Sequence, residues 1–392
     1  MDKKKILIFS TAYYPFVGGA EVAVKEITDH LGNDFDFDLI TARMRKDLPS
    51  FEKIGEVNVY RVGFGNATLD KLLLPFLGAL KVRNLQNKLA KTENYFCFWA
   101  IMITFGSGAA YIYNIFSSIF GRKKIPIVLT LQEGDSEEHL KFRWAGLLAL
   151  SWKMALKYAN FLTGLSSFLI YRAERFKWNG PSCVVPNGVN ISVFSRTISD
   201  IDKEKMMVLL GKKPNEIFLV TTSRLAKKNA VDDIISSLIY LPENISLIII
   251  GKGEEGTKLQ SQVRKLNLSG RVKFIGFVTQ EEIPEYFSIC NIFVRPSRSE
   301  GFGNSFIEAM AAHLPVIATP VGGIVDFLDD KETGIFCSPN NPQSVAQSVK
   351  FILENKELRS KITDQAYNMV VSKFSWESIS EKMKNKVFNQ IK

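Results

Sequence analysis

The chain of 392 residues is poor in the side chains that build disulfide frameworks and metal centres. It has four cysteines and three histidines, and no two cysteines form a Cys-x-x-Cys pair. Scattered cysteines of this kind are typical of reduced, buried thiols rather than of disulfides or zinc sites. We therefore expect neither a metal nor another cofactor.

Signals for export and for nucleic-acid binding are also missing. The basic start of the chain leads into an apolar run, 6–9, that is too short for the hydrophobic region of a secretory signal. The sequence has neither zinc-finger spacing nor a pair of aromatic RNA-binding motifs. These absences predict a cytoplasmic protein that does not bind nucleic acid.

One stretch, 95–121, contains no charged residue and is long enough on paper to span a bilayer. Gly106-Ser107-Gly108 interrupts it near its middle, and its second half contains Asn114. The pattern therefore favours a buried strand at 95–101, a glycine turn and a buried helix at 109–120 over a membrane span.

The formal net charge of +10 indicates a polyanionic partner, either an anionic membrane surface or a phosphorylated substrate. Two segments, 69–91 and 141–157, are amphipathic and basic. Such a segment is typical of a helix that lies on the inner face of an anionic membrane, as a peripheral protein does. It is equally typical of a helix that packs on the core and exposes its lysines to water.

Strand-like and helix-like segments alternate, as in parallel sheets with helices on both faces. The predicted strands are 6–9, 37–41, 57–62, 95–101, 125–131, 161–165 and 182–185, then 217–222, 246–250, 272–275, 291–294 and 315–318. A polar stretch, 191–216, separates the two series. We expect an α/β chain of two Rossmann-like, doubly wound domains that face an interdomain cleft. The domains are placed at 1–200 and 201–373, and a last helix at 374–392 can pack back on the first.

The segment 299–308 combines a strand end, a Gly-Phe-Gly turn and the start of a helix. Backbone N–H groups at such a turn and the positive end of the helix dipole favour a phosphate. Glu308, about one turn into the helix, is placed to accept hydrogen bonds from a vicinal diol such as that of a ribose. The segment therefore predicts a nucleotide site.

Cationic side chains follow the predicted strand 217–222. Arg224 offers a planar fork for phosphate oxygens, and Lys228 offers a point charge. A solvated basic loop is the alternative explanation, since runs of charge usually lie at the surface. Their place directly after a strand, together with the segment 299–308, favours the phosphate.

Two motifs that suggest cofactor or metal binding are better explained as structure. The segment 251–256 is a literal G-x-G-x-x-G, but the acidic residue expected at the end of the next strand is missing, so we interpret its glycines as turn formers. The segment 34–38 contains Asp-x-Asp twice. We interpret it as a strand with Phe35 and Phe37 inward and the aspartates outward, because nothing supplies the further oxygen ligands of a hard cation.

Polar residues also follow the apolar strand 127–131. Gln132, Glu133 and Asp135 would extend from the end of this strand, where carboxylates can orient sugar hydroxyls. The same residues suit a cap for the next helix equally well.

With these residues assembled, nearly the whole chain resembles a retaining glycosyltransferase of the GT-B fold, glycosyltransferase family 4. Each motif is weak alone, but their joint occurrence in this order is specific. They are Gly18-Gly19-Ala20-Glu21, Pro186-Asn187-Gly188-Val189, Arg224-Leu225 with Lys228, Gly251-Lys252-Gly253, Phe274-Ile275-Gly276-Phe277, Glu300 with Glu308, and the run from Pro315 to Gly323.

The resemblance implies a role for each of these positions. Arg224, Lys228 and Glu300 would form the catalytic set, in which the cations neutralise the leaving nucleoside diphosphate and Glu300 contacts the donor sugar. Such fixed charges stabilise the transition state more than the ground state. Donor binding would fall to Gly18, Gly19, Gly253, Phe277, Gly301, Phe302, Gly303, Asn304, Ser305 and Glu308, with backbone amides on the phosphates and the main chain near Phe277 facing the base.

The family transfers its sugar with retention, commonly without a protein nucleophile and mostly without a metal. The resemblance implies a hexose donor linked to UDP or GDP and a glycan or lipid-linked acceptor. Many members have a histidine at the position of Gln132, so this residue departs from the pattern. A sugar-nucleotide epimerase and a catalytically silent GT-B subunit that binds a partner remain alternatives.

Overall fold

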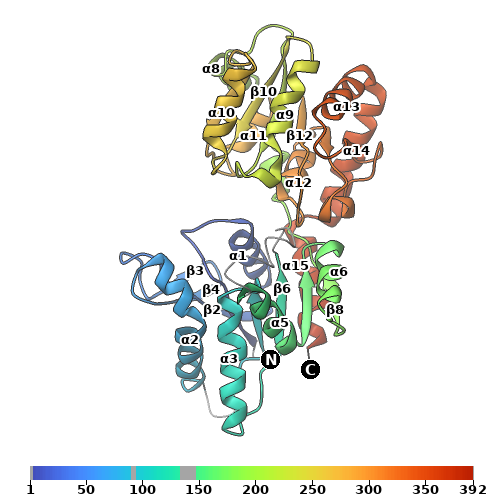
Figure 1. The fold of residues 1–392 in the computed structure, drawn as a ribbon. Helices are drawn as coiled ribbons and strands as arrows, with labels where there is room; N and C mark the ends of the chain where they lie inside the picture. Colours follow the sequence, from blue (N-terminus) through green and yellow to red (C-terminus); the bar gives the residue numbers. More distant parts are fainter. Residues whose placement is uncertain (1–2, 90–93, 133–146, 392) are drawn as a thin grey trace. The chain divides into compact units, whose positions relative to one another are not determined.

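The computed structural model describes residues 3–89, 94–132 and 147–391. The chain forms two compact units, which are coloured along the sequence in Figure 1. Unit 1 comprises Met1–Asn187 and Trp376–Lys392, and unit 2 comprises Gly188–Ser375. The chain therefore passes from one unit to the other at Asn187 and again at Ser375. The sequence had placed the first boundary at residue 200, inside the polar stretch.

Unit 1 contains an eight-stranded sheet in the order β3-β4-β2-β1-β5-β6-β7-β8. All neighbouring strands are parallel except β3 and β4. Central strands such as β5 and β6 are buried along their whole length, because helices cover both faces of the sheet. The strands are β1 (Lys4–Phe9), β2 (Phe35–Ala42), β3 (Phe51–Ile54), β4 (Val57–Val62), β5 (Cys97–Ile101), β6 (Ile127–Leu131), β7 (Phe161–Gly164) and β8 (Ser182–Val184).

The helices of unit 1 connect these strands and supply the rest of its core. They are α1 (Gly19–Leu31), α2 (Ala67–Gln86), α3 (Gly106–Ile119), α5 (Leu147–Tyr158), α6 (Ser167–Arg175) and, from the end of the chain, α15 (Trp376–Lys386). Helix α15 belongs to unit 1 and packs against α1 (Figure 1). The ring of Phe388, just beyond it, contacts Phe35 and Trp99 in the same core. The last helix thus packs on the first domain.

Unit 2 contains a six-stranded parallel sheet in the order β11-β10-β9-β12-β13-β14. Its strands are β9 (Ile217–Thr222), β10 (Ile245–Ile250), β11 (Val272–Gly276), β12 (Ile292–Arg295), β13 (Val316–Ala318) and β14 (Ile335–Phe336). Its helices are α7 (Ile191–Phe194), α8 (Asp200–Leu209), α9 (Val231–Ser237), α10 (Gly256–Lys265), α11 (Ile283–Phe287), α12 (Asn304–Ala311), α13 (Pro342–Glu354) and α14 (Lys356–Lys373). Two parallel α/β domains were predicted, and the structure confirms them.

The polar stretch 191–216 contains the helices α7 and α8, which the sequence had not predicted. Two local expectations were wrong. Helix α3 is buried only on one side, and its last turn exposes Phe116 and Ile119. Asp38 does not point to water: it is buried on β2, where it accepts a hydrogen bond from the Tyr95 hydroxyl at 2.5 Å and pairs with Lys5 at 3.3 Å.

Within the described ranges, no helix is both long enough and apolar enough to cross a bilayer. The uncharged run that raised this question forms the buried strand β5 and the helix α3. The basic segment 69–91 forms most of α2. Of the second basic segment, 141–146 lies outside the described residues and the remainder belongs to α5.

Candidate functional site

Candidate residues follow two neighbouring strands of the unit 2 sheet. Arg224 and Lys228 come after β9, and the segment 299–308 comes after β12. Because β9 and β12 are parallel, both loops leave the same edge of the sheet, the edge at which ligands of doubly wound folds bind. The topology therefore brings the basic turn and the glycine turn together.

Arg295, the last residue of β12, joins these loops, and the sequence had not singled it out. The side chain is buried, and its guanidinium forms an ion pair with the carboxylate of Glu300. The same guanidinium donates to the Ser305 hydroxyl at 2.7 Å and to Asn229 Oδ1 at 3.0 Å. It also lies over the ring of Phe306, 5.2 Å from the centroid. A buried arginine of this kind fixes several loops at once.

Glu300 is held from two directions. One carboxylate oxygen pairs with Arg295, and the other accepts the N–H of Gly301 at 3.1 Å. The side chain is 10% exposed. Its charge is therefore balanced within the protein, and its orientation is fixed before any ligand arrives.

The turn that carries Lys228 is tied to the same cluster. Lys227–Asn229 form a short 3-10 helix, which ends at Ala230 with a φ of 53°. The Asn229 side chain donates to the carbonyl of Arg224 at 2.6 Å while its oxygen accepts from Arg295. Asn229 thus connects the backbone on both sides of Lys228 to Arg295.

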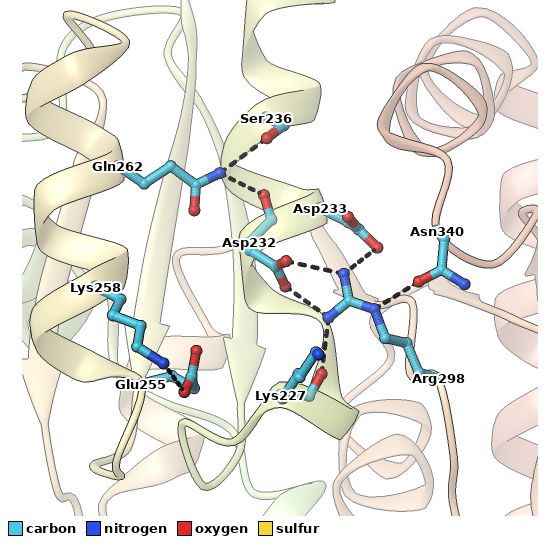
Figure 2. Close-up of polar contacts among 9 residues, drawn as sticks. All are labelled: Lys227, Asp232, Asp233, Ser236, Glu255, Lys258, Gln262, Arg298 and Asn340. Atoms are coloured by element: carbon cyan, nitrogen blue, oxygen red, sulfur yellow. Dashed lines mark hydrogen bonds and ion pairs between the residues drawn. The ribbon is translucent and has the colours of Figure 1, made fainter.

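Arg298 holds this turn from its other side, as Figure 2 shows. Its guanidinium pairs with Asp232 at 2.8 Å and with Asp233 at 2.9 Å, both at the start of α9. It also donates to the Lys227 carbonyl at 2.7 Å and to Asn340 Oδ1 at 2.6 Å. The backbone N–H of Arg298 donates to the carbonyl of Lys228 at 2.7 Å. Arg298 is therefore a clamp for the basic turn, and not a free cation for a ligand.

Two glycines allow loops to lie closer than any other residue would permit. Gly251 has a φ of 133°, and a Cβ there would lie 1.9 Å from the carbonyl oxygen of Ser223. A Cβ on Gly253 would lie 2.4 Å from the oxygen of Leu225. The Leu225 N–H donates to the carbonyl of Lys252 at 3.0 Å, which joins the two loops. The G-x-G-x-x-G segment therefore supports the Arg224 loop, as its interpretation as turn formers implied.

Helix α12 begins at the glycine turn. Gly303 is its N-cap residue, with a φ of 95°, and Asn304 and Ser305 start the helix. The ring of Phe302 is 2% exposed and packs on Phe327 and Phe374. Phe302 was predicted to bind the donor. Because its side chain belongs to the core, only its main chain is present at the turn.

Glu308 lies on α12 with its carboxylate buried. Gln280, in the loop after β11, donates to Glu308 Oε1 at 2.9 Å. Burial raises the pKa of the Glu308 carboxyl to about 7. Gln280 is a neutral partner and uses only one carboxylate oxygen. The carboxylate of Glu308 can therefore accept further hydrogen bonds, for example from ribose hydroxyls.

The other predicted residues lie around this cluster or apart from it. The Arg224 side chain is exposed and pairs with Glu254 at 3.1 Å, and the Phe277 side chain is 73% exposed. Gln132 directly follows β6 in unit 1. Glu133 and Asp135 lie outside the described residues.

Gly18 and Gly19, also in unit 1, begin helix α1, with Gly18 as its N-cap. The carboxyl group of the nearby Glu21 accepts a hydrogen bond from the backbone N–H of Gly18. Burial raises the pKa of this carboxyl group. The Glu21 carboxyl group therefore already binds the amide of Gly18, one of those predicted to receive a phosphate, and a phosphate would have to replace it there.

Among the described residues, no group of three or more His, Cys, Asp or Glu is arranged to hold a metal ion. The second Asp-x-Asp pair uses Asp38 for structure, because this residue bonds Tyr95, Lys5 and the side chain of Asn58.

Comparison with known proteins concerns the sequence of unit 2 and the fold of the chain. Residues 202–369, all in unit 2, match the family Glycosyl transferases group 1. Alpha-monoglucosyldiacylglycerol synthase of Acholeplasma laidlawii is 26% identical to this chain. The aligned region covers 92% of this chain and 91% of the synthase. The chain is a GT-B glycosyltransferase.

Two further similarities place this glycosyltransferase among its relatives. An uncharacterized glycosyltransferase of Methanocaldococcus jannaschii is 29% identical, and the aligned region spans 52% of each chain. The crystal structure of Anabaena HepE with UDP superposes with a TM-score of 0.76 at 21% identity, covering 99% of this chain and 100% of HepE. The second likeness supports the GT-B fold assigned to the glycosyltransferase.

Proposed function

We propose that this glycosyltransferase is a retaining enzyme of family 4 that moves a hexose from a nucleoside-diphosphate sugar to a glycan or a lipid-linked acceptor. One observation carries the proposal: Arg295 joins Glu300, the start of α12 and the Lys228 turn at one edge of the unit 2 sheet. Such a preorganised set of charges and amides suits a leaving diphosphate.

Each part of this cluster has a place in donor binding. The amides from Gly303 to Ser305 face the phosphates, and Lys228 and Arg224 balance the charge that builds on the leaving group. Glu308 accepts the ribose hydroxyls in its ionised form. The main chain beside Phe277 faces the base. The roles of Gly18, Gly19, Gln132, Glu133 and Asp135 in unit 1 remain predictions.

Retention is supported by the state of Glu300. Its carboxylate is buried and paired with Arg295, which makes it a weak nucleophile and a well-oriented contact for the donor sugar. We infer that the acceptor attacks on the face that the leaving group vacates. Proton NMR of the first product tests this step: the anomeric coupling should match that of the donor, and the opposite anomer would exclude a retaining enzyme.

The donor and acceptor are proposed from the relatives. HepE has been solved with UDP and with UDP-glucose, which supports UDP as the first nucleotide to test. The name of the Acholeplasma enzyme contains a glucosyldiacylglycerol, which supports a lipid-linked acceptor. We propose that no metal takes part, so chelation by EDTA should leave transfer unchanged.

A thermal-shift panel of UDP, GDP and ADP tests the donor first, because a ligand that binds only the folded state raises the unfolding temperature. Transfer by Glu308→Ala and Lys228→Ala tests the site, with Lys258→Ala as the control because this lysine pairs with Glu255 at the surface. Near-normal transfer by both site variants would contradict the assignment.

The two alternatives give different outcomes in the same assays. An epimerase leaves the sugar attached to the nucleotide, whereas a transferase releases the nucleoside diphosphate. A silent subunit binds the nucleotide without turnover in every condition. The buried, paired state of Glu300 and the clamped Lys228 turn favour the transferase.

A further inference from the structure

A groove of about 670 Å³ lies between α2 and α3 in unit 1. Its walls combine large apolar side chains with two arginines. The lining residues include Phe76, Leu80 and Arg83 from α2, Phe116 from α3, and Phe120 and Arg122 just after α3. The predicted site residues lie elsewhere, so the groove requires its own explanation.

Helices α2 and α3 lie in close contact near the glycines Gly78 and Gly108. A Cβ on Gly78 would lie 2.7 Å from the Cβ of Ala109, and a Cβ on Gly108 would lie 2.8 Å from Pro75. At this level, a glycine of each helix therefore lies directly against a side chain of the other helix. Apart from Phe76, the groove residues named above come later along the chain than these contacts.

The apolar side chains of this face are strongly exposed. Phe120 is 75% exposed, Ile119 is 70% exposed, and Phe76, Leu80 and Phe116 each exceed half. Single exposed apolar residues are ordinary on a soluble protein, but a contiguous group of large ones marks an interaction surface. We call this group, together with its cations, the α2–α3 face.

The charged residues that line the groove, Arg83 and Arg122, are both cations. Residues 71–88 contain four Lys or Arg and residues 106–124 contain three, and neither range contains Asp or Glu. Three of these cations, Arg122, Lys123 and Lys124, directly follow the exposed end of α3. Apolar side chains bordered by cations fit one kind of surface well, which is an anionic lipid leaflet.

We propose that the α2–α3 face docks unit 1 on an anionic membrane. Phe76, Phe116 and Phe120 enter the boundary between headgroups and acyl chains, and the basic side chains contact lipid phosphates. A second copy of the chain is a poor occupant, because a symmetric contact would bring cations against cations. The proposal does not depend on the donor assignment, since it concerns a different surface of the protein.

Vesicle sedimentation tests the proposal with the full chain. Vesicles of phosphatidylcholine with about one-third phosphatidylglycerol should bind the protein at low salt, while pure phosphatidylcholine should bind it much more weakly. Binding should fall when salt is raised to about 0.5 M, because exposed charges are then screened. Equal binding to both vesicle types would overturn the proposal, and so would no binding to either.

Two variants separate the apolar and the basic parts. Phe116→Ser/Phe120→Ser should reduce binding to the anionic vesicles by about tenfold. Arg122→Glu/Lys123→Glu/Lys124→Glu should reduce it by at least about tenfold. The matched controls lie on unit 2 and change the same number of exposed residues. They are Val208→Ser/Leu209→Ser and Lys350→Glu/Lys356→Glu/Lys361→Glu.

The controls should bind as the unchanged chain does. Equal loss in a face variant and its control would overturn the proposal, because net charge or general surface apolarity would then explain binding. Sedimentation without lipid tests the second copy as occupant: a dimer that Phe116→Ser/Phe120→Ser abolishes would also overturn it. Circular dichroism melting confirms that each variant is folded, as expected for substitutions of exposed residues.

Discussion

Arg295 and Glu300 form a buried ion pair, in which the side chains are only 9% and 10% exposed. The two residues are five positions apart, at the end of β12 and in the loop before α12. Because the same guanidinium also bonds Ser305 and Asn229, the pair holds together the turn after β9, the loop before α12 and the start of α12. Arg295 thus acts through its neighbours and is a positioning residue for the predicted donor site.

Removing Arg295 should affect both stability and transfer. Arg295→Met leaves the buried carboxylate of Glu300 unpaired, which should cost about 3–5 kcal/mol of unfolding free energy. Arg295→Lys should recover little, because an ammonium cannot reach three partners in a plane. Urea unfolding measures the first effect, and kcat at saturating donor measures the second.

Arg271 provides the control for Arg295. Its guanidinium bonds only backbone carbonyls among its described hydrogen bonds, those of Ile245, Leu238, Leu241 and Pro242. Arg271→Met should lower stability without lowering kcat in the folded protein. If Arg295→Met also keeps its kcat while folded, then Arg295 has a structural role only.

Nucleotide binding should depend on pH through Glu308. Burial raises the pKa of its carboxyl to about 7, and ribose hydroxyls donate to the ionised form. As pH falls below 7, affinity should therefore weaken, by at most about tenfold per pH unit. Titration calorimetry between pH 6 and 8.5 measures this slope. Glu308→Gln controls for ionisation of the nucleotide itself, and an unchanged slope in this variant would exclude Glu308 as its source.

The same pKa shift gives a dependence of stability on pH. A carboxyl whose folded pKa lies above its ordinary value keeps a proton that the unfolded chain releases. Its contribution to stability is therefore present below the unfolded pKa of 4.5 and is lost as pH rises toward 7. Glu308→Gln should make the unfolding free energy less dependent on pH in this range.

Gly322 should be irreplaceable because of both its backbone angle and its surroundings. Its φ is 57°, and a Cβ would lie 1.9 Å from the carbonyl oxygen of Glu300. Gly211 has the same φ and nothing within 4 Å of a Cβ. Gly211→Ala should cost about 1 kcal/mol, and Gly322→Ala about 3 kcal/mol, because only the second adds a clash to the strain. Equal losses of unfolding free energy in the two variants would show that the close approach to the Glu300 carbonyl adds no cost at Gly322.

The sheets were predictable because strands buried on both faces read as continuous apolar runs. β9, for example, has the predicted bounds Ile217–Thr222. β3 was missed because an edge strand of the sequence Phe-Glu-Lys-Ile has no such run. Helix α8 was missed because Val208 and Leu209 are exposed and its sequence is mostly polar, so no apolar face marks it.

The site was predictable only where its signal is local. The glycine turn and Glu308 lie within one decapeptide, and their spacing predicts a strand, turn and helix. Arg295 has no such spacing, because its partners Asn229, Glu300 and Ser305 are brought to it by the order of β9 and β12 in the sheet. The local pattern also does not distinguish Phe302, whose ring is in the core, from a residue whose side chain meets a ligand.

Arg298 should support donor binding through the Lys228 turn. Arg298→Lys keeps the charge but loses the fork to Asp232 and Asp233 (Figure 2). Asp233 is a sensitive partner, because burial already raises the pKa of its carboxyl. We expect a loss of about 2 kcal/mol in unfolding free energy. Nucleotide affinity should fall as well, because the carbonyls of Lys227 and Lys228 lose the groups that hold them.

Titration calorimetry with the nucleotide and urea unfolding measure the two effects of Arg298→Lys. Lys258→Ala, which removes the surface pair with Glu255 drawn in the same figure, should change neither quantity. The comparison separates a general loss of charge on unit 2 from loosening of the turn. If Arg298→Lys lowers stability yet binds nucleotide as tightly as the unchanged chain, then the position of Lys228 does not depend on the clamp, and the turn is rigid through Asn229 and Arg295 alone.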